Sequence, residues 1–186
     1  MSKHRFLLSD ESVNSYGFKL KTEGIDTSFF ERNPVMLYEH DSLNLIGRWI
    51  GVKKDGVRLT AEAEFDEEDE MATRVAKKVE KGILNGVSVG FQILETGTEI
   101  GPDGGEIRTV LRSRLMEASL CAVPANGNAL RLYAENGAPV PTATLSAYLN
   151  KQFERDSHKP NDMKLNEENL TALGLGAEAG ETEVNA

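Results

Sequence analysis

Residues 82–91, Gly-Ile-Leu-Asn-Gly-Val-Ser-Val-Gly-Phe, constrain the fold of this chain more than any other stretch. They combine a turn with an apolar strand that carries one hydroxyl group, on Ser88. Because alternate strand residues point to opposite sides of a sheet, that hydroxyl lies on a defined face. Gly86 and Gly90 flank it, and glycine within a strand often marks close approach of backbone or ligand. Ser88 is therefore placed as a nucleophile would be, although most strand serines only fill a crowded position.

Length and charge limit the class of protein. The chain has 186 residues, enough for one domain with its own core and a tail. Its formal net charge is −9, and no basic cluster is dense enough to follow a phosphate backbone, so direct nucleic-acid binding is disfavoured. No apolar run has the length of a membrane span, and the N-terminal apolar stretch is too short for a signal peptide. We therefore expect an intracellular protein without a membrane segment.

Neither a disulfide nor a metal site is expected. The single cysteine, Cys121, lies in the apolar sequence Ser-Leu-Cys-Ala-Val and is expected to be a small buried residue. The acidic run at 66–70 is a candidate for metal ligands, but it lacks the separated spacing of a metal-binding loop. Acidic residues before an apolar stripe are more typical of a helix start. No motif indicates a cofactor.

Alternating and apolar segments predict a mainly β domain. Strands are expected at 4–8, 13–20, 35–41, 45–52, 57–65, around Ser88 and at 110–123. Asp55-Gly56 predicts a hairpin between two of them. Helices are expected from the acidic run to a Gly82 cap and at 142–153. The glycine-rich segment 96–108 is either a long loop or an extended hairpin tip.

Three uncommon side chains fall on three separate predicted strands. His40 ends an apolar run, and catalytic groups commonly lie where a strand opens into a loop, although a lone histidine there is more often structural. Glu117 lies among apolar residues, where a carboxylate needs a partner because an unpaired buried charge is costly. With Ser88 they match the nucleophile, base and orienting acid of a serine hydrolase triad. The sequence alone does not bring them together in space.

Four ordered blocks carry a resemblance to a known family. They are Asn-Pro-Val-Met-Leu-Tyr-Glu-His-Asp at 33–41, Ile-Gly-Arg at 46–48, the stretch 82–91, and Leu-Met-Glu-Ala-Ser-Leu-Cys-Ala-Val-Pro-Ala-Asn at 115–126. In order and rough spacing they resemble the tailed-phage prohead maturation proteases over about residues 5–135. The resemblance implies a serine endopeptidase related in fold to the herpesvirus assemblins. The implied fold class is α+β, mainly β, with a small, mostly antiparallel β-barrel flanked by helices.

The same resemblance implies roles for the three side chains. His40 would be the general base, Ser88 the nucleophile and Glu117 the third member. The assemblins use a second histidine in third place, but the other histidines, His4 and His158, lie outside the matching blocks. The oxyanion hole cannot be placed from the sequence. Arg112 and Arg114 are candidates to support it, with solvated strand charges as the alternative reading.

The resemblance also implies substrates and a location. The enzyme would be packaged in the immature phage capsid within the host cytoplasm, or in a prophage-encoded equivalent. There it would cut scaffold protein, part of the major capsid protein and itself. The oligomeric state, including a homo-oligomer, is left open. One rival is a non-catalytic scaffold or capsid-assembly protein. An esterase is another, but Gly86-Val87-Ser88-Val89-Gly90 lacks the following helix of a nucleophile elbow.

The chain divides into two parts by composition. Residues 1–155 are expected to form the catalytic domain. Residues 156–186 are acidic and poor in large apolar side chains, so they are expected to be a disordered linker or the start of a scaffold segment. The segment 163–175 resembles the openings of scaffold portions in phage protease–scaffold fusions. The alternative is a solvated tail with no role.

Overall fold

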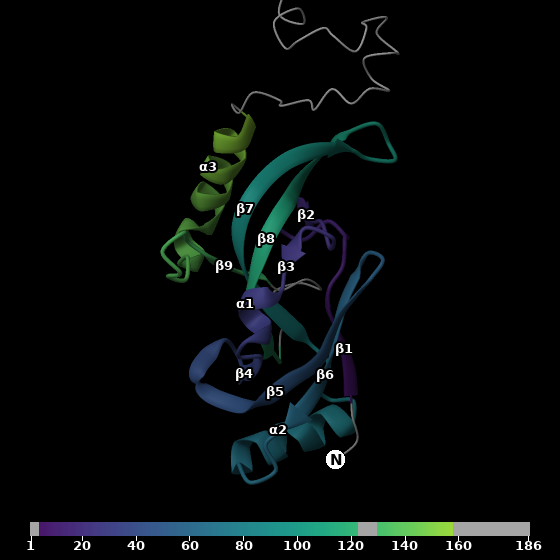
Figure 1. Ribbon diagram of the computed structural model, residues 1–186, viewed down its shortest axis with the longest axis vertical. Helices are drawn as coiled ribbons and strands as arrows, with labels where there is room; N and C mark the ends of the chain where they lie inside the picture. Colours follow the sequence, from purple (N-terminus) through teal and green to yellow (C-terminus); the bar gives the residue numbers. More distant parts are fainter. Residues whose placement is uncertain (1–3, 123–129, 158–186) are drawn as a thin grey trace, which may run out of the picture.

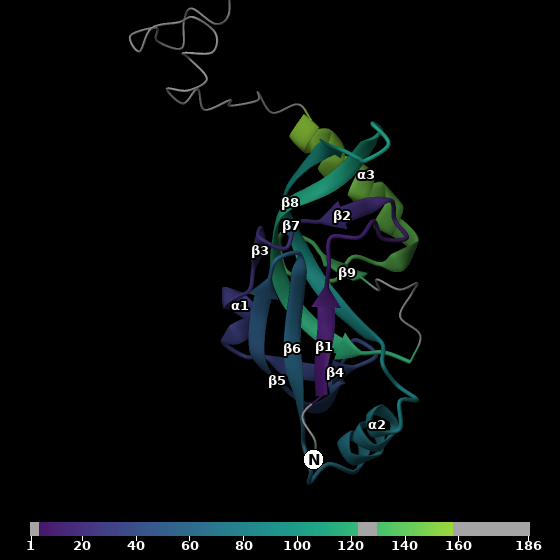
Figure 2. The same ribbon diagram turned by 90° about the vertical axis from the view of Figure 1, so that its right-hand side faces the viewer.

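A computed structural model of the chain describes residues 4–122 and 130–157. These residues form an elongated, strongly curled sheet, with α2 at one end and α3 beside the other (Figures 1 and 2). In chain order the elements are β1 (His4–Ser9), β2 (Phe18–Leu20), β3 (Ile25–Asp26), α1 (Ser28–Glu31), β4 (Val35–Tyr38), β5 (Asp41–Asp55), β6 (Arg58–Phe65), α2 (Glu70–Glu80), β7 (Val87–Ile100), β8 (Glu106–Leu120), β9 (Leu130–Tyr133), the 3-10 helix η1 (Thr142–Thr144) and α3 (Leu145–Ser157).

The sheet is open and mixed. Its strand order is β1-β6-β5-β4-β8-β7-β9, and β2 and β3 also pair with β8. The mainly β class expected from the sequence is confirmed. The expected small, mostly antiparallel barrel is confirmed only in part: the sheet curls but is open, and β2, β3 and β4 run parallel to β8 while β9 runs parallel to β7. These short crossover strands add to the central hairpin without joining β1 to β9, so the sheet curls but stays open.

Two expected strands are shorter in the structure. Only Phe18–Leu20 of the segment 13–20 pairs with the sheet. The side chain of Asn14 accepts hydrogen bonds from the backbone N–H groups of Tyr16 and Phe18, which holds the preceding residues in a turn. The strand expected at 35–41 ends at Tyr38, because the next two residues leave the extended conformation.

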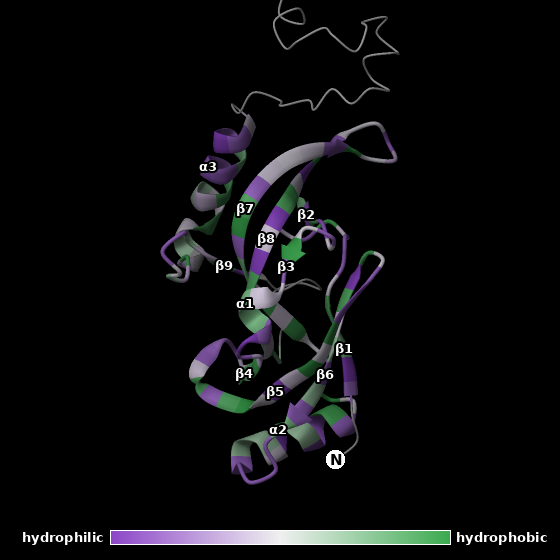
Figure 3. Ribbon diagram, in the orientation of Figure 1, coloured by the Kyte–Doolittle hydropathy of each residue, from purple (hydrophilic) through white to green (hydrophobic). Residues whose placement is uncertain are grey.

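The long β7–β8 hairpin is the central structural element of the domain (Figure 1). The glycine-rich segment that was expected to be a loop or a hairpin tip is a hairpin tip, since β7 runs to Ile100 and β8 begins at Glu106. Gly101 and Gly105 close the tip through a backbone hydrogen bond of 2.7 Å. Hydrophilic and hydrophobic residues alternate along parts of the strands (Figure 3), and the buried apolar residues form the core.

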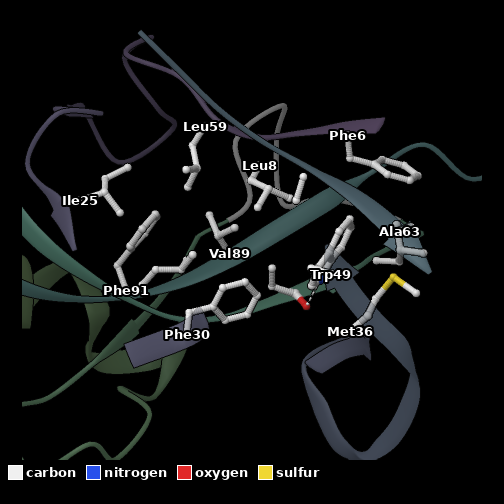
Figure 4. Close-up of a cluster of buried hydrophobic side chains, with 14 of the residues drawn as sticks. Phe6, Leu8, Ile25, Phe30, Met36, Trp49, Leu59, Ala63, Val89 and Phe91 are labelled. Carbon is white, nitrogen blue, oxygen red and sulfur yellow. Dashed lines mark hydrogen bonds between the residues drawn. The ribbon is translucent and has the colours of Figure 1, made fainter. Parts of the chain in front are cut away.

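The core is tied to β8 by one buried indole (Figure 4). Trp49 on β5 is 1% exposed, and its Nε1–H donates to the carbonyl of Ala118 at 3.0 Å. The ring of Phe6 packs edge-on against it, with centroids 5.6 Å apart. Because Ala118 follows Glu117 directly, this bond fixes β8 next to the residue whose carboxylate projects from it.

The helix before β7 agrees with its sequence signals. Asp69 caps α2 by accepting a hydrogen bond from the backbone of Ala72 at 2.6 Å, and the helix buries Val75 and Val79. Gly82 follows its C-terminal end with φ 68°, the left-handed conformation that glycine adopts most easily. The helix therefore ends where the sequence predicts, and the next residues lead directly into β7.

The C-terminal helix is joined to the hairpin beyond the predicted domain boundary. The carboxylate of Asp156 accepts hydrogen bonds from the backbone N–H and the hydroxyl of Thr96, at 2.8 and 2.9 Å. The boundary expected after Arg155 thus falls inside α3. The segment 158–186, which contains most of the expected tail, lies outside the described residues. In the part of the chain that is described, no helix has the length and hydropathy that a membrane span requires.

We expect Trp49→Phe to destabilise the protein by about 1 to 3 kcal/mol, because a buried carbonyl loses its donor and the smaller ring leaves space. The free energy of unfolding is measured by urea denaturation. Tyr148→Phe is the matched control, since it removes a hydroxyl that donates to the Tyr133 carbonyl at a half-buried site. It should cost less than Trp49→Phe. Equal stability of Trp49→Phe and the wild type would contradict the role given to the indole.

Candidate active site

The three side chains singled out from the sequence meet at one end of the β7–β8 ladder. Ser88 lies on β7, Glu117 on β8 and His40 in the turn between β4 and β5. Nε2 of His40 is 2.6 Å from Oγ of Ser88, and Nδ1 is 2.7 Å from Oε1 of Glu117. The imidazole thus bridges the hydroxyl and the carboxylate, as a general base does in a serine hydrolase triad.

The register of the hairpin places the serine and the acid on the same side of the sheet. Ser88 pairs with Ser119, and Gly90 pairs with Glu117. Directly opposed residues of antiparallel strands point to the same face, so the hydroxyl and the carboxylate project together. Ser88 is fully buried and Glu117 is 5% exposed, whereas the His40 side chain is 20% exposed. Of the three, the histidine is the most accessible from solvent.

Gly90 makes room for the acid. A Cβ at this position would lie 2.6 Å from Oε1 of Glu117 and 2.5 Å from the ring of Tyr133. No side chain fits at either distance, so glycine is required for the carboxylate to reach His40. The expectation that a glycine beside Ser88 marks a close approach is confirmed here, and the group that approaches is the catalytic candidate itself.

A second serine completes the hydrogen bonding of the carboxylate. The hydroxyl of Ser119 donates to Oε2 of Glu117 at 2.7 Å, while Oε1 faces His40. An ionised carboxylate only accepts hydrogen bonds, so a neutral imidazole that faces it carries its proton on Nδ1. Nε2 is then free to accept the proton of Ser88. The buried charge has the partners that its apolar surroundings demand.

The sequence interpretation missed Ser119, Tyr133 and Arg131. Ser119 stands two residues after Glu117, the spacing that puts both on one face of a strand, and this signal was available. Arg131 on β9 donates from Nη1 to the carbonyl of His40 at 2.7 Å. It stands 91 residues from His40 in the chain, so only the parallel pairing of β9 with β7 brings it there.

Arg112 and Arg114, which the sequence offered as supports of an oxyanion hole, lie in ion pairs. Arg112 pairs with Glu95 on β7, and Arg114 pairs with Asp26 on β3, each at 3.6 Å. Arg114 also donates to the side chain of Gln92 at 3.2 Å. These contacts favour the reading of both residues as strand charges rather than as supports of an oxyanion hole.

Neither the cysteine nor the acidic run forms a competing site. Cys121 is buried, as expected, and burial, together with the negative charges of Glu39 and Glu117, raises the pKa of its thiol to about 12. Within the described residues, no group of three or more histidine, cysteine or acidic side chains is placed to hold a metal ion. In the acidic run, Asp69 serves as the helix cap described above.

Comparison with known proteins identifies the family of the chain. A family model described as caudovirus prohead serine protease matches residues 8–141, well over half of the chain. The chain belongs to this family. The match spans β7 and β8, which carry Ser88 and Glu117, the turn that carries His40, and β9.

One curated relative of this chain is the prohead protease of Escherichia phage T5. It is 28% identical over 106 residues, which cover 57% of this chain and 48% of the relative. The aligned region therefore spans about half the length of that relative. No solved structure matches the chain at a significant level.

In this family member we expect Ser119→Ala to slow reaction of Ser88 with a small fluorophosphonate about tenfold, because one hydrogen bond to a buried carboxylate is lost. The labelling rate is followed by intact-protein mass spectrometry. Ser113→Ala is the matched control, since Ser113 is also a buried serine on β8 and its hydroxyl has no hydrogen-bond partner among the described residues. Ser113→Ala should label at the wild-type rate. Equal labelling of both variants would remove Ser119 from the site.

We also expect native Cys121 to resist iodoacetamide. With a pKa of about 12, only about one thiol in 10⁴ is ionised at pH 8, and the thiolate is the reactive form. The mass of the native protein should stay unchanged, and guanidinium-unfolded protein should gain one adduct. Rapid alkylation of the native protein would show that the thiol is accessible and reactive beside the proposed serine.

Proposed function

We propose that this chain is a serine endopeptidase with Ser88 as nucleophile, His40 as general base and Glu117 as the orienting acid. The observation that carries the proposal is the unbroken hydrogen-bond path from Ser88 through His40 to Glu117. Family membership supports the reaction class independently. A non-catalytic assembly protein would have no need to hold these three groups in line within a buried region.

The geometry supports a two-step acyl transfer. Oγ of Ser88 bonds to the peptide carbonyl carbon, and its proton passes to Nε2 of His40. Glu117 holds Nδ1–H and stabilises the imidazolium that forms. The same proton then goes to the leaving amine as the peptide C–N bond breaks. Water, deprotonated by His40, then attacks the carbonyl carbon of the acyl-enzyme ester. The ester bond to Oγ of Ser88 breaks, His40 returns the proton to Oγ, and the carboxylic acid product leaves.

A peptidase fits this site better than an esterase of the nucleophile-elbow type. That elbow needs a sharp turn between a strand and a helix at the serine. Here β7 continues through Ser88 as a strand to Ile100, and the next element is β8. The partial match to the elbow motif is therefore a coincidence of letters.

For substrates, we propose the scaffold protein, the N-terminal part of the major capsid protein and the chain itself, all inside the immature capsid. Support comes from the family and from the name of the T5 relative. Confinement would give a high local concentration, at which even a weak peptide site is filled. The free, dilute enzyme would then be nearly inactive, including on unrelated soluble proteins.

We further propose that the catalytic domain extends through α3, with the residues after it as a linker or the start of a scaffold segment. The bonds between Asp156 and Thr96 support a domain end after Ser157 rather than after Arg155. This places the whole of α3 with the hairpin on which it packs.

We expect Ser88→Ala and His40→Ala each to abolish cleavage, with losses of roughly 10⁶ in kcat, and Glu117→Gln to lose less, because an orienting acid usually contributes less. The test is co-expression of each variant with capsid and scaffold proteins, followed by mass spectrometry of the cleavage products. Ser113→Ala is the control for a buried serine outside the site. Products of unchanged amount with Ser88→Ala would refute the assignment.

A further inference from the structure

His40 occupies a turn whose backbone conformation is rare for its residue types. Tyr38 on β4 pairs with Asp41 on β5, so Glu39 and His40 are the two central residues of a hairpin turn. Their φ angles are 56° and 59°, and they are the only non-glycine residues of the described part with positive φ. Positive φ at both central positions characterises a type I′ turn.

Neither residue is suited to this turn by itself. Type I′ turns strongly favour Asn-Gly, Asp-Gly or Gly-Gly, because a Cβ is unfavourable in the left-handed region. Glutamate and histidine therefore need outside contacts to stay there. Backbone strain of this kind persists only where the surrounding structure determines it, and such positions cluster at active sites.

The contacts of Glu39 come from the end of β8. Its backbone N–H donates to the carbonyl of Leu120 at 2.9 Å. Its side-chain Oε1 accepts from the backbone N–H of Ala122 at 2.7 Å. Glu39 thus uses both its backbone and its carboxylate to hold the first turn residue against the strand that carries Glu117.

The contact of His40 comes from β9. Nη1 of Arg131 donates to the His40 carbonyl at 2.7 Å, and the guanidinium carbon lies 5.8 Å from the centre of the Tyr133 ring. Arg131 stands opposite Gly90 in the parallel pairing of β9 with β7. Hydrogen bonds from a charged donor are stronger than those between neutral groups. The second turn residue is therefore held from the other side of the site.

We propose that Arg131 and Glu39 are positioning residues for the general base. They hold the turn in the left-handed conformation that directs the His40 ring between Ser88 and Glu117. The inference rests on the proposed function, because it concerns the same histidine. Neither residue touches the reacting atoms.

The expected effect of losing either contact follows from geometry. Without it, the turn relaxes toward negative φ and Nε2 of His40 moves away from Ser88. A displacement of about 1 Å costs on the order of 100-fold in rate. The carbonyl needs only one donor, and the Ala122 N–H needs only one acceptor. Arg131→Lys therefore keeps a donor for the His40 carbonyl, and Glu39→Gln keeps an acceptor for the Ala122 N–H.

The experiment compares four variants of the full chain: Arg131→Met, Arg131→Lys, Glu39→Met and Glu39→Gln. Reaction of Ser88 with a small fluorophosphonate is followed by intact-protein mass spectrometry, because this probe needs no peptide-binding surface. We expect the two methionine variants to label about 10- to 100-fold more slowly than the wild type. The lysine and glutamine variants should recover most of the rate.

Two further readouts separate positioning from other roles. With a peptide substrate, the methionine variants should lose kcat while KM changes by less than about twofold. In proton NMR spectra, the downfield signal of the His40 Nδ1–H held by Glu117 should weaken or disappear in Arg131→Met and return in Arg131→Lys. A residue that only stabilised the fold would not show this pattern at a temperature where all variants are folded.

The matched control is Arg114→Met, which removes an arginine of the same sheet whose partners are Asp26 and Gln92. It should label at the wild-type rate. The proposal is overturned if Arg131→Met also labels at that rate, or if its defect lies in KM alone, which would make Arg131 a substrate contact. It is also overturned if lysine restores nothing while both variants lose the same stability.

Failure of the proposed function gives a different result. In that case the wild-type protein itself is not labelled at Ser88 and does not cleave peptides. The NMR signal of His40 still reports whether Arg131 holds the ring, because it requires no catalysis. Loss of that signal in Arg131→Met supports the positioning role, and its persistence overturns it.

Discussion

The antiparallel ladder between β7 and β8 is the constraint on which the site depends. Its register sets Ser88 opposite Ser119 and Gly90 opposite Glu117, so the hydroxyl and the carboxylate share one face. A slip of one strand by one residue would turn the hydroxyl and the carboxylate to opposite faces. The buried indole bond to the carbonyl after Glu117 ties β8 to β5 from the core side. The long hairpin therefore supports the fold and also positions two members of the proposed triad.

The third group is added to this frame at a conformational cost. Two consecutive left-handed residues with side chains cost roughly 1 to 3 kcal/mol each. The surrounding contacts offset that cost with bonds from the end of β8 to Glu39 and from β9 to His40. As a result, the imidazole projects from a rigid turn, with Nε2 facing Ser88 and Nδ1 facing Glu117. The two non-glycine residues of the described chain with positive φ thus lie where the proposed chemistry needs a fixed side chain.

Sequence signals and structure agree where a local pattern decides the outcome. The helix before β7 has its acidic cap and its terminal glycine, and the glycine-rich segment near residue 100 is a hairpin tip. Sequence signals and structure disagree where pairing with distant parts of the chain decides the outcome. The expected barrel is an open, mixed sheet, because the short strands β2, β3 and β4 add parallel to β8. Nothing in strands of two to four residues specifies such pairing.

The sequence by itself determined which side chains were unusual for their positions: a hydroxyl between glycines, a carboxylate among apolar residues, a histidine after an apolar run. Such signals are local, since they depend on periodicity and burial along one strand. Only the tertiary structure decided that these groups meet, because His40 lies 48 residues from Ser88 and 77 from Glu117. It also decided the supporting contacts of Ser119 and Arg131, since strand register and parallel pairing across such separations are set by packing of the whole sheet.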